Sequence, residues 1–206
     1  GNGVVDEDDK TIIGEAMPQH TGGFTINGNW KAIDFSVGFT YQIGGDVYNA
    51  NAMHSLMGNK DNSAGQNRLK FVSETFKYYD VDTNGDLMLV KDPTALVALN
   101  ANTNYSSFFS EYGIVSSKFI EDASYLRLNT LTVGYTFPKN WMNKIGLQNA
   151  RVYFTGSNLF CIDGYSGIDP DVNTKTDGKD GFPTPYFDYQ SYPKARTYTF
   201  GVNLTF

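Results

Sequence analysis

The sequence predicts an all-β chain with about five long antiparallel strands. Several stretches alternate apolar and polar side chains, as expected for a strand with one greasy and one polar face. The composition agrees, because 40% of the residues are hydrophobic, 18% are charged, and Tyr, Phe and Gly number 14, 15 and 21. No apolar run reaches the roughly 18 residues that a transmembrane helix requires, so strands are the elements that would cross a membrane.

The last stretch of the chain shows the alternation most clearly. Tyr198, Phe200, Val202, Leu204 and Phe206 fall on one side of a strand, and the residues between them are polar or glycine. A soluble sandwich strand can show the same pattern, but a lipid-facing strand has more reason to end on an aromatic residue. The order of residue types resembles the C-terminal assembly signal of bacterial outer-membrane β-barrels. Its residues would be Tyr198, Phe200, Gly201, Leu204 and Phe206.

A hairpin of two long strands is predicted near the start of the chain. Residues 24–30 and 33–43 both alternate, and a tight Lys31-Ala32 connection joins them. The second strand is long enough to cross a bilayer at a tilt. We expect its apolar side chains, with those of the last strand, to face lipid: Phe35, Val37, Phe39, Phe200, Val202 and Leu204.

Between residues 44 and 117 the alternation stops, which predicts a long irregular region. Such a loop is unusual inside a compact soluble domain but common on the outer side of a barrel. Alternation returns at 120–137, where the apolar parity changes near Asn129-Thr130 and predicts a β-bulge. Residues 151–162 form the next predicted strand, and 163–194 form a second long loop.

Two acidic stretches resemble parts of a calcium-binding loop. Asp80, Asp82, Asn84 and Asp86 provide oxygen ligands at alternate positions, with a glycine where a sharp turn is needed. The twelfth position is Lys91 in place of Glu, so a plain Asx-Gly turn is the alternative. At the start of the chain, Asn2, Asp6 and Asp9 match the second half of such a loop, with an acidic surface turn as the alternative. Calcium is therefore the one cofactor that the sequence suggests.

Several motifs resemble the C-terminal part of SusC/RagA-type TonB-dependent outer-membrane transporters. The resemblance spans both ends of the chain and is weakest between residues 59 and 117. It is carried by Asp9-Lys10-Thr11-Ile12-Ile13-Gly14, Ala123-Ser124-Tyr125-Leu126-Arg127-Leu128, Leu131-Thr132-Val133-Gly134-Tyr135-Thr136-Phe137-Pro138, Gly156-Ser157-Asn158-Leu159-Phe160, Tyr165-Ser166-Gly167-Ile168-Asp169-Pro170 and Tyr192-Pro193-Lys194-Ala195-Arg196.

The resemblance implies that residues 1–206 are part of a large, plugged barrel in the outer membrane. The plug and the rest of the wall would come from an N-terminal part of the same protein, which would also contact the TonB complex. The short connections would be periplasmic, and the two long loops would be extracellular. Such a protein would import oligosaccharides or peptides together with a surface lipoprotein resembling SusD.

The second long loop contains the candidate contact residues. Aromatic side chains there are expected to stack on sugars or to contact the lipoprotein, or alternatively only to order the loop. They are Tyr165, Tyr186, Phe187, Tyr189 and Tyr192. No residue spacing suggests catalysis, since His20 and His54 are isolated. The net charge of -6 argues against nucleic acid as a partner. A secreted, soluble all-β module that binds glycans is the alternative from another class.

Overall fold

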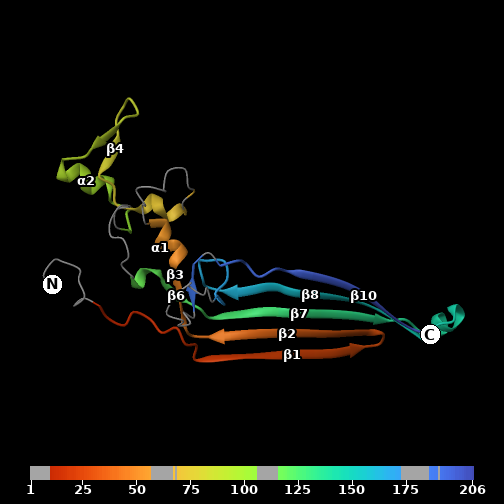
Figure 1. Cartoon of the computed structure of the whole chain (residues 1–206). Helices are drawn as coiled ribbons and strands as arrows, with labels where there is room; N and C mark the ends of the chain where they lie inside the picture. Colours follow the sequence, from red (N-terminus) through yellow and green to blue (C-terminus); the bar gives the residue numbers. More distant parts are fainter. Residues whose placement is uncertain (1–9, 57–66, 68, 106–115, 173–185, 190) are drawn as a thin grey trace, which may run out of the picture. The chain divides into compact units, whose positions relative to one another are not determined.

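A long five-stranded antiparallel sheet dominates the computed structural model (Figure 1). The structure describes residues 10–56, 67, 69–105, 116–172, 186–189 and 191–206. The strands follow the order β1-β2-β7-β8-β10, so β1 and β10 are the two edges. Their bounds are β1 His20–Trp30, β2 Ile33–Ile43, β7 Tyr125–Thr136, β8 Asn149–Asp163 and β10 Thr197–Thr205. The predicted all-β wall of about five antiparallel strands is confirmed.

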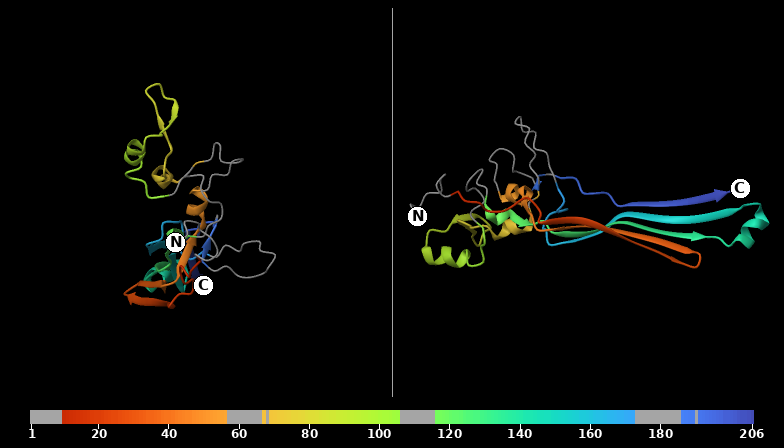
Figure 2. Two further views of the ribbon diagram at one scale, coloured as in Figure 1. Left: turned by 90° about the vertical axis from the view of Figure 1, so that its left-hand side faces the viewer. Right: turned by 90° about the horizontal axis from the view of Figure 1, so that it is seen from below.

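The two ends of this sheet differ, as Figures 1 and 2 show. At one end, here named the turn end, β1 and β2 join through Lys31-Ala32, and β10 finishes. The connection from β7 to β8 lies there too. It contains a short helix, α3 (Lys139–Met142), and a 3-10 turn, η4 (Asn143–Ile145), which Gly146 ends in the left-handed conformation. The expected turn after β7 is therefore helical.

At the other end, named the loop end, three short strands form a second sheet. They are β3 (Asp46–Asn49), β6 (Ile120–Asp122) and β9 (Phe187–Asp188), in the order β6-β3-β9. The prediction of one continuous strand over 120–137 is wrong, because the chain breaks at Ala123-Ser124. There the Ala123 amide donates to the carbonyl of Gly45 (2.9 Å), and the Ser124 hydroxyl accepts from the amide of Gly44 (2.9 Å).

The register of β7 confirms the predicted bulge. Phe39 lies opposite Leu128, but Gly38 lies opposite Thr130, so Asn129 is an extra residue relative to β2. On the other side, β8 has one more residue than β7 in the same stretch, and Asn158 there has a φ of 53°. The two shifts bring β8 back into phase with β2. Consequently Leu126 and Leu128 lie on the same face of the sheet as Leu131 and Val133.

Residues 50–119 form a separate compact unit, which is described here by itself. The expectation of an irregular region is only partly correct. Its elements are α1 Ala50–Leu56, η2 Lys70–Glu74, β4 Tyr79–Val81, β5 Leu87–Leu89, α2 Pro93–Leu99 and η3 Ser117–Phe119. Asp92 caps α2 by accepting from the Ala95 amide (2.8 Å), and Pro93 occupies the first turn. No helix in the described residues is long and apolar enough to cross a membrane.

Candidate functional site: a two-faced wall and the loop cluster at its end

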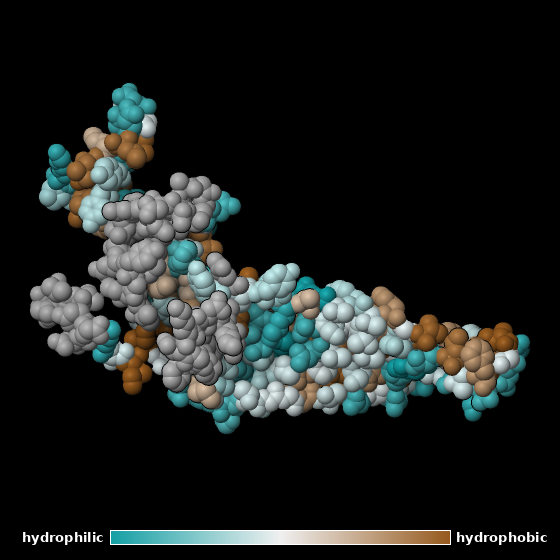
Figure 3. Space-filling model, viewed as in Figure 1, coloured by the Kyte–Doolittle hydropathy of each residue, from teal (hydrophilic) through white to brown (hydrophobic). Residues whose placement is uncertain are grey.

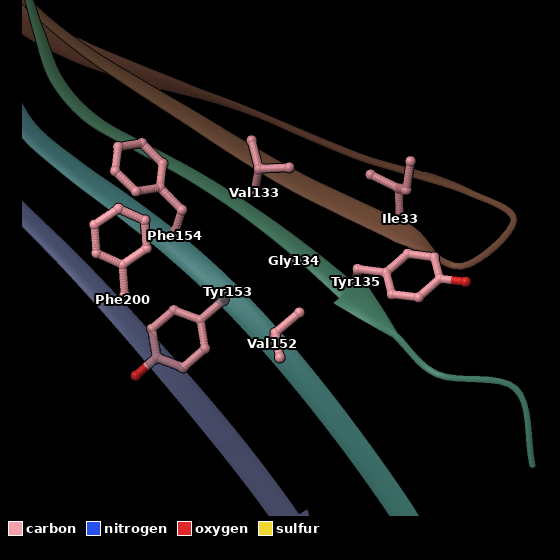
Figure 4. Close-up of a pocket in the computed structure, with 8 residues that line it drawn as sticks. All are labelled: Ile33, Val133, Gly134, Tyr135, Val152, Tyr153, Phe154 and Phe200. Atoms are coloured by element: carbon pink, nitrogen blue, oxygen red, sulfur yellow. The ribbon is translucent and has the colours of Figure 1, made fainter. Parts of the chain in front are cut away.

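One face of the five-stranded sheet is apolar and exposed. Strand pairing places Phe154 opposite both Val133 and Phe200, and Val152 opposite both Tyr135 and Val202. A shallow groove on the sheet (Figure 4) is lined by Ile33, Val133, Gly134, Tyr135, Val152, Tyr153, Phe154 and Phe200. Phe200 is 79% exposed and Val202 is 62% exposed. Such a row of exposed aromatic and aliphatic residues suits lipid better than water.

The predicted lipid-facing residues all lie on this face. Phe39 stacks on Phe24 with ring centroids 5.0 Å apart, and Phe35 lies opposite Gly28, filling the space that a side chain there would take. On β10, Leu204 lies opposite Ala150. The apolar surface therefore runs across all five strands.

The opposite face is polar and carries an ion pair that spans three strands. Arg151 of β8 donates from Nε and Nη2 to the two carboxylate oxygens of Asp34 on β2, at 2.9 and 2.5 Å. Its guanidinium passes over Gly134 of β7, where a Cβ atom would overlap it. Thr132 and Thr155 share a hydrogen bond nearby (3.0 Å). In Figure 3 most of the sheet surface that is not grey is white to teal. A polar face of this kind suits a barrel interior.

A second close approach joins β8 to the last strand on the polar face. The ring of Tyr153 lies over Gly201, and a Cβ atom at residue 201 would overlap Tyr153 Cζ. Gly201 therefore provides space for a neighbouring ring. This contact positions β10 against β8.

At the loop end, a buried ion pair fixes the second long loop to the sheet. Arg127 Nη2 of β7 donates to Asp169 Oδ1 at 2.6 Å, and the two side chains are only 7% and 9% exposed. Asp169 Oδ1 also accepts from the Asp171 amide (2.9 Å). This pair was not predicted from the sequence, although a lone Arg between Leu126 and Leu128 in a predicted strand is a usable sign.

Tyr165 lies inside a small core at the base of the same loop. Its side chain packs with Val47, Ala123 and Val172 and is 7% exposed. The hydroxyl donates to Asp188 Oδ2 at 2.7 Å. Burial is the larger cause that raises the pKa of Tyr165, and this hydrogen bond to a carboxylate is the second. The ring is thus a structural part of the loop and is not placed to contact a substrate.

Three further candidate contact residues lie nearer the surface of the loop. The Tyr186 hydroxyl donates to Gln42 Oε1 (3.0 Å), and burial raises the pKa of this tyrosine. Phe187 stacks on Tyr48 with ring centroids 5.4 Å apart. Tyr189 is 39% exposed. Of the predicted contact residues, Tyr189 and the 91% exposed Tyr192 are therefore the best placed to contact another molecule.

A scan against models of known protein families finds no match. The whole chain is 30% identical over 207 residues to TonB-dependent receptor P3 of Formosa agariphila and 29% identical over 214 residues to TonB-dependent receptor SusC of Bacteroides thetaiotaomicron. Its fold matches a solved structure of the RagAB peptide importer in its closed-closed state over the whole chain, with a TM-score of 0.63 at 21% identity. The chain is part of a SusC/RagA-like TonB-dependent receptor. It spans 18% and 17% of the two relatives and 20% of the solved chain.

In this receptor segment, the predicted assembly-signal residues occupy both faces of β10. Tyr198 and Phe200 flank Phe154, with ring centroids 6.2 and 5.1 Å apart. Leu204 lies on the same apolar face, whereas Gly201 lies on the polar face. Phe206 is 80% exposed. The role of these residues as an assembly signal stays a prediction.

The acidic stretch of the receptor segment forms the β4-β5 hairpin turn. The Asp82 carboxylate accepts from the amides of Asp86 (2.9 Å) and Asn84 (2.8 Å), and these bonds lower its pKa. Gly85 takes a φ of 92°. This is an Asx turn, the alternative to a calcium loop. In the described residues no three acidic, His or Cys side chains gather to hold a metal, so calcium at Asp80, Asp82, Asn84 and Asp86 stays a prediction without geometric support. Asn2, Asp6 and Asp9 lie outside the described residues.

Proposed function

We propose that this chain forms part of the wall of an outer-membrane transporter that imports oligosaccharides or peptides. The observation that carries the proposal is the two-faced sheet, in which exposed Phe200 and Val202 lie on one face and the Arg151–Asp34 ion pair lies on the other. Lipid against the apolar face and a polar lumen against the opposite face would suit the side chains of both faces. The TonB-dependent relatives support energy-coupled import as the function of the whole protein.

The two edges of the sheet indicate that the wall needs further strands. β1 and β10 are each paired on one side only in the five-stranded sheet. Unpaired backbone groups in lipid cost several kcal/mol each, so spanning sheets are closed. The rest of the barrel, with its plug, would therefore pair with β1 and β10 and would contain the part that contacts the TonB complex.

The difference between the two ends of the sheet indicates which end is periplasmic and which is extracellular. The turn end has a tight hairpin and a short helical connection, whereas the loop end gives rise to the long connections from β2 to β7 and from β8 to β10. Short periplasmic turns and longer extracellular loops are typical of outer-membrane barrels. In this arrangement Tyr189, on the loop that Arg127 and Asp169 fix in place, would face the cargo or a SusD-like lipoprotein.

The alternative of a soluble glycan-binding module requires a buried apolar face. In a β-sandwich the two inner faces pack on each other. Here Phe200, Val202 and Leu204 are at least half exposed, and the small β6-β3-β9 sheet continues from the loop end of the strands. The exposed face thus favours the membrane wall.

Cysteine labelling of intact cells tests the location and direction. In the full-length receptor with Cys161→Ser, a membrane-impermeant maleimide should label Ile168→Cys on whole cells, because residue 168 is exposed at the loop end. The matched variant Gln148→Cys, exposed at the turn end, should react only after the outer membrane is permeabilised. The reverse pattern, or labelling of both positions in intact cells, contradicts the proposal.

Uptake measurements test the cargo. Cells that carry the receptor should accumulate fluorescent oligosaccharides or peptides from defined pools, and this uptake should stop when either the receptor or the TonB complex is deleted. Uptake of both pools that is unchanged in the receptor deletion would exclude these cargo classes.

A further inference from the structure

We propose that the turn end of the sheet binds the phosphate-bearing headgroups of anionic phospholipids in the membrane leaflet that surrounds it. This inference rests on the proposed membrane wall. The turn-end surface is defined by Trp30, Lys31, Lys139, Trp141, Lys144 and Ile145.

Strand pairing brings the members of this surface together. The Thr136 amide donates to the carbonyl of Ala32 (2.8 Å), so the end of β7 lies against the β1-β2 turn. Lys139, the first residue of α3, follows three residues later, and η4 with Lys144 continues directly from α3. The two connections therefore share one end of the wall (Figure 1).

Two tryptophans mark the depth of this surface in the bilayer. Trp30 lies opposite Ile33, and so on the apolar face of the sheet, where it is 64% exposed. Trp141 is 58% exposed on α3. Exposed tryptophans at the ends of membrane-spanning elements lie at the level of the lipid headgroups. The residues beside them are therefore at headgroup depth.

The charge at this depth is positive. Lys31 Nζ lies 4.8 Å from the centre of the Trp30 ring, which holds the ammonium group at the edge of the apolar face. Lys139 and Lys144 are exposed, and none of the three lysines forms an ion pair within the described part of the chain. Asp34, the acidic residue of the hairpin, is paired with Arg151 on the polar face.

The exposed lysines and the tryptophans beside them together indicate which lipids the turn-end surface binds. The chain as a whole has a net charge of -6, so the positive charge of this end is a local feature that runs against the overall balance. Cationic side chains beside an aromatic belt attract lipids whose headgroups carry net negative charge, and each lysine near such a surface contributes about a fivefold change in affinity. Zwitterionic lipids offer no such gain.

Lipid retention by the full-length receptor tests the inference. The receptor is placed in nanodiscs with equal amounts of phosphatidylcholine and phosphatidylglycerol, extracted, and washed in detergent, after which the retained lipids are identified by native mass spectrometry. The wild-type protein should retain phosphatidylglycerol preferentially. Lys31→Gln, Lys139→Gln and Lys144→Gln together should reduce this preference by about fivefold for each lysine, and added salt should weaken it.

A matched variant removes the same charge elsewhere. Lys70→Gln, Lys77→Gln and Lys91→Gln change three exposed lysines of the separate 50–119 unit and should leave the preference intact. An unchanged preference in the turn-end variant overturns the inference and leaves these lysines as a surface for an acidic protein. An equal loss in both variants overturns it as well.

Gel mobility separates this inference from the proposed function. A folded barrel migrates differently before and after heating, so wild-type receptor that shows no such shift refutes the membrane wall itself. A wild-type shift without lipid preference refutes only the lipid site. If the triple variant shows no shift, the single Lys31→Gln variant is compared with Lys70→Gln in the same way.

Discussion

Gly201 in the last strand provides the space for the ring of Tyr153. Because a Cβ atom there would overlap Tyr153 Cζ, Gly201→Val should force the ring away from β10 and reduce the stability of the folded barrel by about 1 to 3 kcal/mol. The measurement is unfolding of the full-length receptor in urea, followed by gel mobility. A loss of stability here would show that Gly201 acts through packing and not only through recognition by assembly machinery.

Two further variants make this prediction specific. Gly164 has no atom within 4 Å of the position that a Cβ atom would take, and its φ is ordinary, so Gly164→Ala should change little. In a Tyr153→Ala background the ring is gone, and Gly201→Val should then cost much less than in the wild type. Equal costs with and without the ring would contradict the packing role.

Asp169 is expected to hold the second long loop against the sheet. Asp169→Ala leaves the guanidinium of Arg127 buried without its partner, which should destabilise this attachment of the loop by about 3 to 5 kcal/mol. Hydrogen exchange of residues 163–172 should then accelerate while the strands stay protected. Asp171→Ala removes an exposed ion pair with Lys194 and should cost less than about 1 kcal/mol. Similar rates of hydrogen exchange in the two variants would contradict the expectation that Asp169 fixes the loop to the sheet.

The faces of β10 give a prediction for a whole strand. Val202 lies on the apolar face and Asn203 on the polar face next to it, opposite Arg151. Val202→Arg places a charge in lipid and should cost about 2 to 4 kcal/mol near the membrane centre, whereas Asn203→Arg should cost less. Urea unfolding of both variants provides the comparison. If Asn203→Arg proved far more damaging, the two faces would be assigned backwards.

The long strands were predictable because their side chains alternate. The parity change around Asn129 even revealed the bulge, since Leu128 and Leu131 cannot share a face of a regular strand. The start of β1 at His20 was not predicted, because the residues Thr21, Gly22 and Gly23 carry no apolar side chain to show a period. Alternation therefore locates strands only where one face is apolar.

The loop-end structures were not predictable by the same reasoning. Strands β6 and β9 are three and two residues long, too short to show a period. The burial of Tyr165 depends on Asp188, 23 residues away, and on Val47 of β3. Such long-range contacts leave no local pattern, so an aromatic residue that looked like a ligand contact proved to be part of a core.

For the whole molecule, the decisive property of the proposed wall is that one face of the sheet is apolar and the other is polar. The apolar face crosses all five strands, and the Arg151–Asp34 pair joins three of them on the other side. The sheet would not be stable in water alone, because one face exposes large apolar side chains and the edges offer unpaired backbone groups. The proposed wall thus requires a bilayer on one side and further strands at β1 and β10.

Spin-label accessibility along β10 tests this requirement most directly. Nitroxides are attached singly at residues 199, 200, 202, 203 and 204 of the full-length receptor in lipid vesicles, and their collisions with oxygen and with a water-soluble nickel chelate are compared. Oxygen concentrates in lipid, so labels at 200, 202 and 204 should favour oxygen and labels at 199 and 203 should favour the chelate. Uniform access of the chelate to all five positions, or the opposite alternation, would contradict the membrane wall.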